Sequence, residues 1–195
     1  MATIILASAS AARKAVLAGA GVAFEVIPAN VDERAVEAPL PAAGKSPAEV
    51  ALALAEAKAL AVPSGDALVI GADQTLDLDG ARFVKPESIA AARDQIEALS
   101  GRTHRLHSGL AGARGGRIVW RHVGTAALTM RALSAGEIDA YLARVGEAVL
   151  GSVGAYQIEG PGIQLFEAIE GDHFTILGPP LLPLLQWLRA EGALG

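Results

Sequence analysis

The chain contains no cysteine, which excludes a disulfide framework, a zinc–thiolate site and an iron–sulfur cluster. It also lacks a G-x-x-x-x-G-K-[ST] phosphate loop. No apolar run reaches the roughly 18 to 20 residues needed to cross a bilayer. The N-terminus has neither the basic start nor the long apolar core of a secretory signal. We therefore expect a cytoplasmic protein that does not enter a membrane.

Aromatic residues make up only 4% of the 195 positions, so aliphatic side chains must build the core, and hydrophobic residues reach 52%. Lysine and arginine are outnumbered by acidic residues, which gives a formal net charge of −5. Proteins hold nucleic acid mainly through lysine and arginine contacts to phosphates. The acidic balance therefore argues against a nucleic-acid partner.

Short apolar runs and helix signals are interspersed along the chain. Thr3 to Ala7 and Leu68 to Ala72 are typical of buried strands. Ser46 and Ser134 each begin a capping box that predicts a helix start. This mixture predicts an α/β fold, with a mixed twisted sheet and helices on its faces. The other expected elements are strands over 22–28, 103–111 and 117–130, a hairpin of 165–169 with 173–177, a loop or lid over 30–45, and helices over 10–18, 88–99 and 179–191.

Two serines and an arginine form the first candidate site. Ser8, Ser10 and Arg13 lie where the first predicted strand ends and a helix begins. Free N–H groups and the helix dipole favour an anion at such a point, and hydroxyl and guanidinium donors suit phosphate oxygens. The alternative is that Ser10 only caps the helix and Arg13 lies on a solvated face.

Carboxylates and lysines form the second candidate site. Asp73 follows the predicted strand 68–72, where a metal ligand or general base would be held rigidly. With Glu33 it could supply the two carboxylates that Mg²⁺ often uses alongside phosphates and waters. Lys58 and Lys85 could neutralise the charge of a triphosphate. Alternatively, Asp73 is a turn or capping residue and Glu33 is a solvated loop residue. Lys58 and Lys85 are then ordinary surface lysines.

An ordered set of short motifs resembles the Maf family over nearly the whole chain. No single tetrapeptide in the set is specific, but the order is. The motifs are L-A-S-A-S-A-A-R at 6–13, V-D-E at 31–33, A-E-A-K-A at 55–59, G-A-D-Q at 71–74, K-P at 85–86, S-G-R-T-H at 100–104, Q-I-E-G at 157–160, G-I-Q-L-F-E at 162–167, E-G-D at 170–172 and T-I-L-G at 175–178.

The resemblance implies one Maf-like domain over residues 1–195, with two lobes around a deep cleft, in a fold similar to that of the inosine triphosphate pyrophosphatases. It implies hydrolysis of a nucleoside triphosphate to the monophosphate and pyrophosphate, with a divalent cation such as Mg²⁺ as cofactor. A homodimer is common among such folds. The family's roles, carried over by position, make Asp73 the base and metal ligand with Glu33 beside it, and give phosphate binding to Ser8, Ser10, Arg13, Lys58 and Lys85.

Three positions bear on the choice of base. Ala12 stands where many family members, including the thymidine-selective branch, carry arginine. The branch that acts on 7-methyl-GTP lacks that arginine. Gln74 and Glu159 also resemble the 7-methyl-GTP branch. A carboxylate at 159 can accept both N1–H and the exocyclic amine of guanine. The alternatives are a pyrophosphatase for dTTP, UTP or inosine-type nucleotides, and a non-catalytic regulator of septum formation.

Overall fold

The computed structural model describes residues 2–195 and contains a mixed sheet of seven strands. The strand order is β2-β1-β3-β5-β6-β7, and β4 pairs with β3 outside this path. Strand β1 is parallel to β2 and β3, whereas β4 and β7 are antiparallel to their neighbours. The strands are β1 (Ile4–Leu6), β2 (Glu25–Val26), β3 (Leu68–Leu78), β4 (Ala81–Phe83), β5 (Thr103–Arg114), β6 (Arg117–Met130) and β7 (Phe166–Glu170).

Helices separate and follow these strands, so the predicted mixed α/β class is confirmed. The helices are α1 (Ala11–Gly19), α2 (Glu33–Glu37), α3 (Pro47–Leu60), α4 (Ile89–Leu99), α5 (Ala135–Val145), α6 (His173–Leu177) and α7 (Leu181–Ala190), with three 3₁₀ helices η1 (Gly146–Gly151), η2 (Val153–Ala155) and η3 (Pro161–Leu165). Within residues 2–195, no helix is both long enough and apolar enough to cross a membrane.

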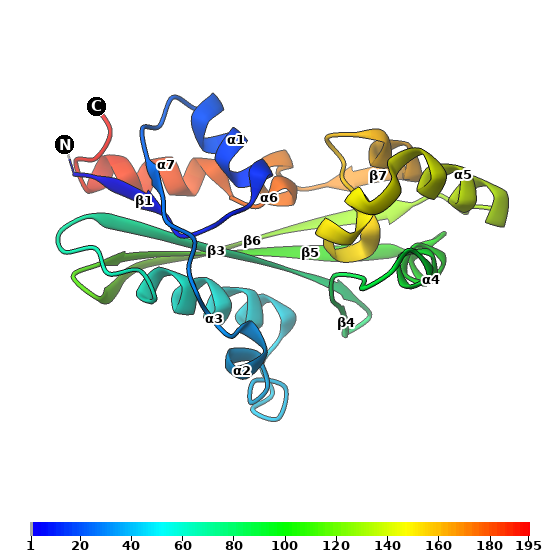
Figure 1. The fold of residues 1–195 in the computed structure, drawn as a ribbon, viewed down its shortest axis with the longest axis horizontal. Helices are drawn as coiled ribbons and strands as arrows, with labels where there is room; N and C mark the ends of the chain where they lie inside the picture. Colours follow the sequence, from blue (N-terminus) through cyan, green and yellow to red (C-terminus); the bar gives the residue numbers. More distant parts are fainter. Residues whose placement is uncertain (1) are drawn as a thin grey trace. The chain divides into compact units, whose positions relative to one another are not determined.

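The chain divides into two compact units. Unit 1 contains the residues up to Gln74 together with His107–Thr125 and Asp172–Gly195, and unit 2 contains Thr75–Leu106 and Ala126–Gly171. In unit 1, α3 lies on one side of the strands, and α1 and α7 lie on the other (Figure 1). Unit 1 is therefore a three-layer arrangement.

The two faces of β1 belong to two different apolar clusters. Ile4 and Leu6 pack in the cluster that includes the α7 residue Leu184, whereas Ile5 packs in the cluster that includes the α3 residue Ala55. Successive side chains of a strand point to opposite faces, so a strand covered on both sides needs an unbroken apolar run. The sequence Thr3 to Ala7 meets that need, and its prediction as a buried strand is confirmed.

Helix α3 lies unusually close to the sheet. A Cβ atom placed on Gly71 in β3 would be 2.0 Å from the carbonyl oxygen of Ala55, and one on Gly109 in β5 would be 2.5 Å from that of Ala51. Only glycine on the strands and alanine on the helix leave room for this approach. The alanines of α3 therefore have a packing role, which composition alone did not reveal.

Unit 2 is built around α4 and α5, which contact each other and the 3₁₀ helix η1. Both helices begin at a serine cap. The side chain of Ser88 accepts from the Ala91 N–H, and Ser134 forms the predicted capping box with Glu137. The predicted capping box of Ser134 therefore located the start of α5 correctly, and the helix predicted over 88–99 is confirmed as α4.

Three predicted elements differ from the structure. The hairpin of 165–169 with 173–177 is wrong, because β7 pairs with β6 and residues 173–177 form helix α6. The predicted loop over 30–45 contains α2, which begins after the capping side chain of Asp32. The strand predicted to end at Ala72 continues to Leu78, so Asp73 lies within β3 and not at its end.

Candidate active site

Lys58 of α3 joins the two carboxylates that the sequence singled out. Its Nζ lies 2.5 Å from Oδ1 of Asp73 and 2.8 Å from Oε1 of Glu33. The side chains of Lys58 and Asp73 are nearly buried, at 12% and 11% exposure, whereas Glu33 is 54% exposed. The close approach of α3 to Gly71, two residues before Asp73, places the ammonium group at the strand. Folding therefore gathers Glu33, Lys58 and Asp73 from three separate elements.

Burial dominates the ionisation of Asp73. Desolvation raises the pKa of its carboxyl group, and the positive charges of Lys58 and Arg13 oppose that rise, while the charge of Glu33 adds to it. A carboxylate with a raised pKa is a better proton acceptor than an ordinary one. The group thus has the property expected of a general base.

Replacement of Lys58 by Met should shift the pH dependence of activity. Without the ammonium group the pKa of Asp73 rises further, because a charge that lowers it is lost. Activity that needs ionised Asp73 exists above that pKa, so the acid limb of the kcat/KM profile should move to higher pH. The matched control is Lys45→Met, since Lys45 is exposed and pairs with Glu49 instead. An acid limb at the same pH in Lys58→Met and the parent would contradict this assignment.

Arg13 is held by a long-range contact and is not on a solvated face. Its Nε donates to the carbonyl of Gly178 at 2.6 Å, and its Nη1 donates to Oγ of Ser8 at 3.0 Å. Burial lowers the pKa of the guanidinium, and the negative charges of Asp73 and Glu33 oppose that fall. The three groups therefore interact electrostatically within unit 1.

The two serines before α1 have contacts inside the protein. Oγ of Ser10 accepts from the backbone N–H of Arg13 at 3.4 Å, so Ser10 is the N-cap of α1. Oγ of Ser8 accepts from the N–H of Ser10 at 3.3 Å as well as from Arg13. Ser10 therefore caps the helix, as the alternative interpretation predicted. Phosphate binding by Ser8 and Ser10 stays a prediction.

Gln74 directs its amide into the protein. Its Nε2 lies 2.9 Å from Oγ of Ser108, 3.1 Å from the carbonyl of Thr175 and 2.9 Å from that of Ile176. An amide nitrogen carries two hydrogens, so these three acceptors already engage it fully. The role of Gln74 in base selection stays a prediction, limited to its carbonyl oxygen.

Lys85 and Glu159 belong to unit 2, and both are exposed, while Ala12 is partly buried in α1 of unit 1. Lys85 follows β4, and Glu159 lies between the buried Ile158 and the 3₁₀ helix η3. Phosphate binding by Lys85 and base recognition by Glu159 therefore stay predictions. The deep cleft also stays a prediction.

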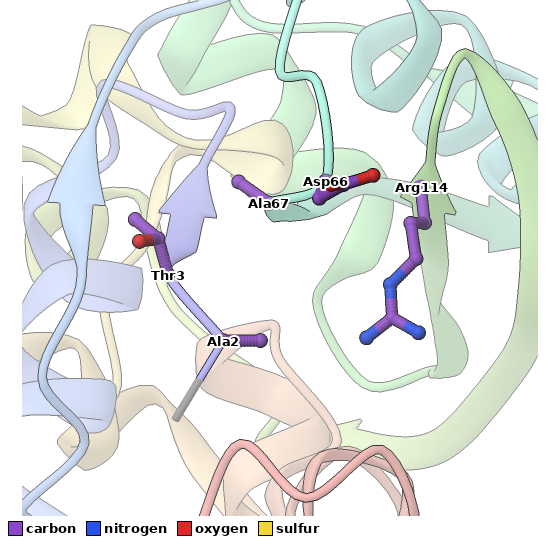
Figure 2. A pocket seen from close by; sticks show the side chains of 5 residues that line it. All are labelled: Ala2, Thr3, Asp66, Ala67 and Arg114. Atoms are coloured by element: carbon purple, nitrogen blue, oxygen red, sulfur yellow. The ribbon is translucent and has the colours of Figure 1, made fainter.

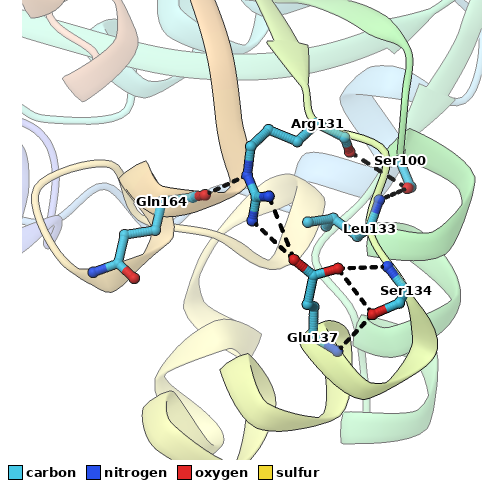
Figure 3. Close-up of polar contacts among 6 residues, drawn as sticks. All are labelled: Ser100, Arg131, Leu133, Ser134, Glu137 and Gln164. Carbon is cyan, nitrogen blue, oxygen red and sulfur yellow. Dashed lines mark hydrogen bonds and ion pairs between the residues drawn. The ribbon is translucent and has the colours of Figure 1, made fainter.

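The segment that carries Glu159 is fixed on both sides within unit 2. Before it, the buried hydroxyl of Tyr156 lies 2.6 Å from Nε2 of His104, whose pKa is lowered to about 4 by burial. After it, Arg131 donates from Nε to the carbonyl of Gln164 and from its terminal nitrogens to Glu137 of the capping box (Figure 3). These contacts anchor the chain on either side of Glu159, whose own side chain is exposed.

Asp73 and Glu33, which both contact Lys58, are the candidate ligands for Mg²⁺. Mg²⁺ is commonly bound by one or two carboxylates with substrate phosphates and waters. Among residues 2–195 no group of three or more His, Cys, Asp or Glu side chains could hold a metal ion. Asp73 and Glu33 would hold such an ion together with phosphate oxygens and waters, and this metal site stays a prediction.

A separate hollow of about 410 Å³ in unit 1 has none of the candidate residues in its lining (Figure 2). The Arg114 guanidinium in its lining is already paired with Glu191 at 2.8 Å.

Three residues of the site were not predicted from the sequence. They are Ser108, Thr175 and Gly178, which contact Gln74 or Arg13. The T-I-L-G motif at 175–178 was the signal for Thr175 and Gly178, and none of the motifs included Ser108.

Residues 3–191 match the model of the Maf family, described as Maf-like protein, so the chain belongs to the Maf family. It is 58% identical over 193 residues to a protein of Rhizobium meliloti named 7-methyl-GTP pyrophosphatase, covering 98% of this chain and 97% of that one. A protein of the same name from Brucella abortus is 55% identical over 190 residues, with 96% of each chain covered.

A Nitrobacter hamburgensis protein named nucleoside triphosphate pyrophosphatase is 49% identical over 191 residues, which covers 98% of this chain and 95% of that one. Among solved structures, a HAM1 protein from Coxiella burnetii is 17% identical, over 67% of this chain and 73% of that chain, with a TM-score of 0.45. That likeness is too weak to bear on the site.

Proposed function

We propose that the chain hydrolyses a nucleoside triphosphate to the monophosphate and pyrophosphate, with a preference for modified guanine nucleotides such as 7-methyl-GTP. The observation that carries the proposal is the nearly buried Lys58, which joins Asp73 to Glu33 in the unit that also holds Arg13. The names of the relatives that share 49 to 58% of their residues with it support the same reaction.

The residues of unit 1 have different proposed roles in phosphoanhydride hydrolysis. Ionised Asp73 accepts a proton from the attacking water, and its raised pKa makes it an effective base. Arg13 and Lys58 neutralise the negative charge of the phosphates. A divalent cation, proposed as Mg²⁺ on Asp73 and Glu33, would supply further charge neutralisation when bound. Lys85 is proposed to add positive charge, and Ser8 and Ser10 to donate to phosphate oxygens.

The products and the metal requirement test this proposal directly. The purified protein is incubated with 7-methyl-GTP and Mg²⁺, and the products are separated by ion-exchange chromatography. We expect the monophosphate and pyrophosphate in equal amounts, and little turnover when EDTA replaces Mg²⁺. Release of a nucleoside diphosphate with orthophosphate would refute the assigned bond. Full turnover in EDTA would refute the metal while leaving the bond assignment standing.

The choice of base is proposed to depend on Ala12 and Glu159. N7-methylation places positive charge on guanine, which strengthens its pairing with a nearby carboxylate. Ala12 adds no cation that would repel the methylated base. Gln74 remains a candidate for this role only through its carbonyl oxygen. The cytoplasmic location and the homodimer stay predictions from the sequence.

Glu159→Gln should reduce the preference for 7-methyl-GTP over dTTP and UTP by on the order of tenfold or more, if one charge-assisted hydrogen bond of ~1.5 to 3 kcal/mol is lost. The measurement is kcat/KM for each triphosphate with parent and variant. The control is Glu167→Gln, because Glu167 is an exposed glutamate of β7 in the same unit. If the ranking of substrates is the same in Glu159→Gln as in the parent, Glu159 does not read the base.

A further inference from the structure

Helix α6 has the length of little more than one turn, yet both of its ends are capped. At the start, Oδ2 of Asp172 accepts from the N–H and the hydroxyl of Thr175, at 2.9 and 3.1 Å. At the end, Gly178 adopts a left-handed conformation with φ of 62° and donates its N–H back to Phe174. A helix this short gains little from its own hydrogen bonds, so its position depends on contacts with other elements of unit 1.

The carbonyl groups at the end of α6 are the ones that a helix leaves without partners. In this structure three side chains donate to them. Gln74 donates to Thr175 and Ile176, Ser108 donates to Thr175 at 2.7 Å, and Arg13 donates to Gly178. The end of the helix also carries partial negative charge, which favours the guanidinium there. Gln74 and Arg13 thus meet at the same helix end.

Gly178 also limits how far this arrangement can move. A Cβ atom on Gly178 would lie 3.2 Å from Oγ of Ser108 and 3.3 Å from Nε2 of Gln74. The donors therefore pack directly against the residue whose carbonyl orients Arg13. The Gln74 amide and the carbonyl that accepts from Arg13 therefore lie at the same helix end.

We propose that Gln74 is a positioning residue, which orients the phosphate-binding Arg13 through the carbonyl end of α6. This inference rests on the proposed function for its substrate. Gln74 follows Asp73 directly in β3, so one strand carries the base and also fixes the place of the arginine. The guanidinium has five N–H groups, and its two bonds to Gly178 and Ser8 set its plane while leaving donors for phosphate oxygens.

The test is a double-mutant cycle between Gln74 and Arg13. Gln74→Met keeps the length of the side chain and removes both donors. We expect kcat/KM to fall by about tenfold or more on every triphosphate in a panel of 7-methyl-GTP, GTP, dTTP and UTP, because a small misplacement of a positioning group is costly. The ratios among the four substrates should stay within about twofold of the parent. In an Arg13→Gln background the same change should cost less than about twofold.

Two further variants separate positioning from loss of folding. Ser108→Ala removes one donor to Thr175 and should show a weaker form of the same uniform loss. The control is Gln186→Met, since Gln186 is an exposed glutamine of α7 in the same unit. It should match the parent in every assay. Circular dichroism at the assay temperature confirms that each variant is folded before its activity is compared.

Binding of inorganic pyrophosphate, measured by calorimetry, gives a readout that does not need turnover. The dissociation constant should rise by about tenfold in Gln74→Met, and should rise little further when that change is added to Arg13→Gln. If the parent hydrolyses no triphosphate, the proposed function fails and this binding cycle still decides the inference. A changed substrate ranking in Gln74→Met, or losses that multiply fully in the double variant, would overturn the positioning role.

Discussion

Asp73→Asn should lower kcat by ~10²- to 10⁴-fold, the usual cost of losing a positioned general base. The amide keeps the shape of the side chain and can still accept from Lys58, whose Nζ lies 2.5 Å from Oδ1 of Asp73. What is lost is the negative charge that takes a proton from water. Steady-state hydrolysis of 7-methyl-GTP by folded variant and parent is the measurement. Near-normal turnover in the variant would assign the base to another residue.

The same variant should be at least as stable as the parent at neutral pH. Burial raises the pKa of Asp73, so the folded protein holds this proton more tightly than the unfolded chain does. Protonated Asp73 therefore makes its full contribution to the free energy of unfolding below the ordinary carboxyl pKa. That contribution is lost as the pH rises through the raised pKa. Asparagine stays neutral and avoids that loss. A lower free energy of unfolding for the variant in urea at pH 7 would contradict this reasoning.

Gly71→Ala should destabilise the fold by about 3 kcal/mol or more, at or above the upper end for an overpacked core. The added Cβ would lie 2.0 Å from the carbonyl oxygen of Ala55 and 2.6 Å from the backbone nitrogen of Ala59. Both obstacles are backbone atoms of α3, so no side-chain rotation relieves them. Because α3 carries Lys58, its displacement should also reduce activity in whatever protein remains folded.

The matched control for Gly71 is Gly136→Ala in the first turn of α5. No atom lies within 4 Å of a Cβ placed there, and its backbone is helical. Alanine loses less conformational entropy than glycine in a helix, so this variant should be unchanged or more stable by ~0.4 to 1 kcal/mol. Thermal and urea unfolding of the two variants decide the comparison. Equal stability of Gly71→Ala and the parent would show that α3 can move away freely.

Helix starts were predictable because their signals are local. Ser46 and Ser134 each have the glutamate of their capping box three residues further on, and both boxes form. The segment 173–177 was misread because five residues are too few for periodicity to separate a strand from a helix. Its decisive feature was Asp172, which caps the helix through Thr175. The predicted hairpin of 165–169 with 173–177 placed Asp172 in its turn.

The candidate residues of the site could be named from the sequence, but their partners could not. Lys58 and Asp73 stand 15 positions apart, and Arg13 and Gly178 stand 165 apart. Such pairs follow from the packing of α3 and α6 and not from any local pattern. For the same reason the amide of Gln74 looked like a base-reading group, whereas its donors contact α6.

The discontinuous make-up of unit 1 has a consequence for synthesis on the ribosome. Ile4 and Leu6 of β1 share an apolar cluster with Leu184 and Leu188 of α7, so one layer of this core is translated long before another. Until α7 emerges, one face of β1 has no helix from the C-terminal segment to cover it. Such exposed apolar surface favours aggregation and binding by chaperones. The nascent chain therefore depends on the α7 segment to complete the core of unit 1.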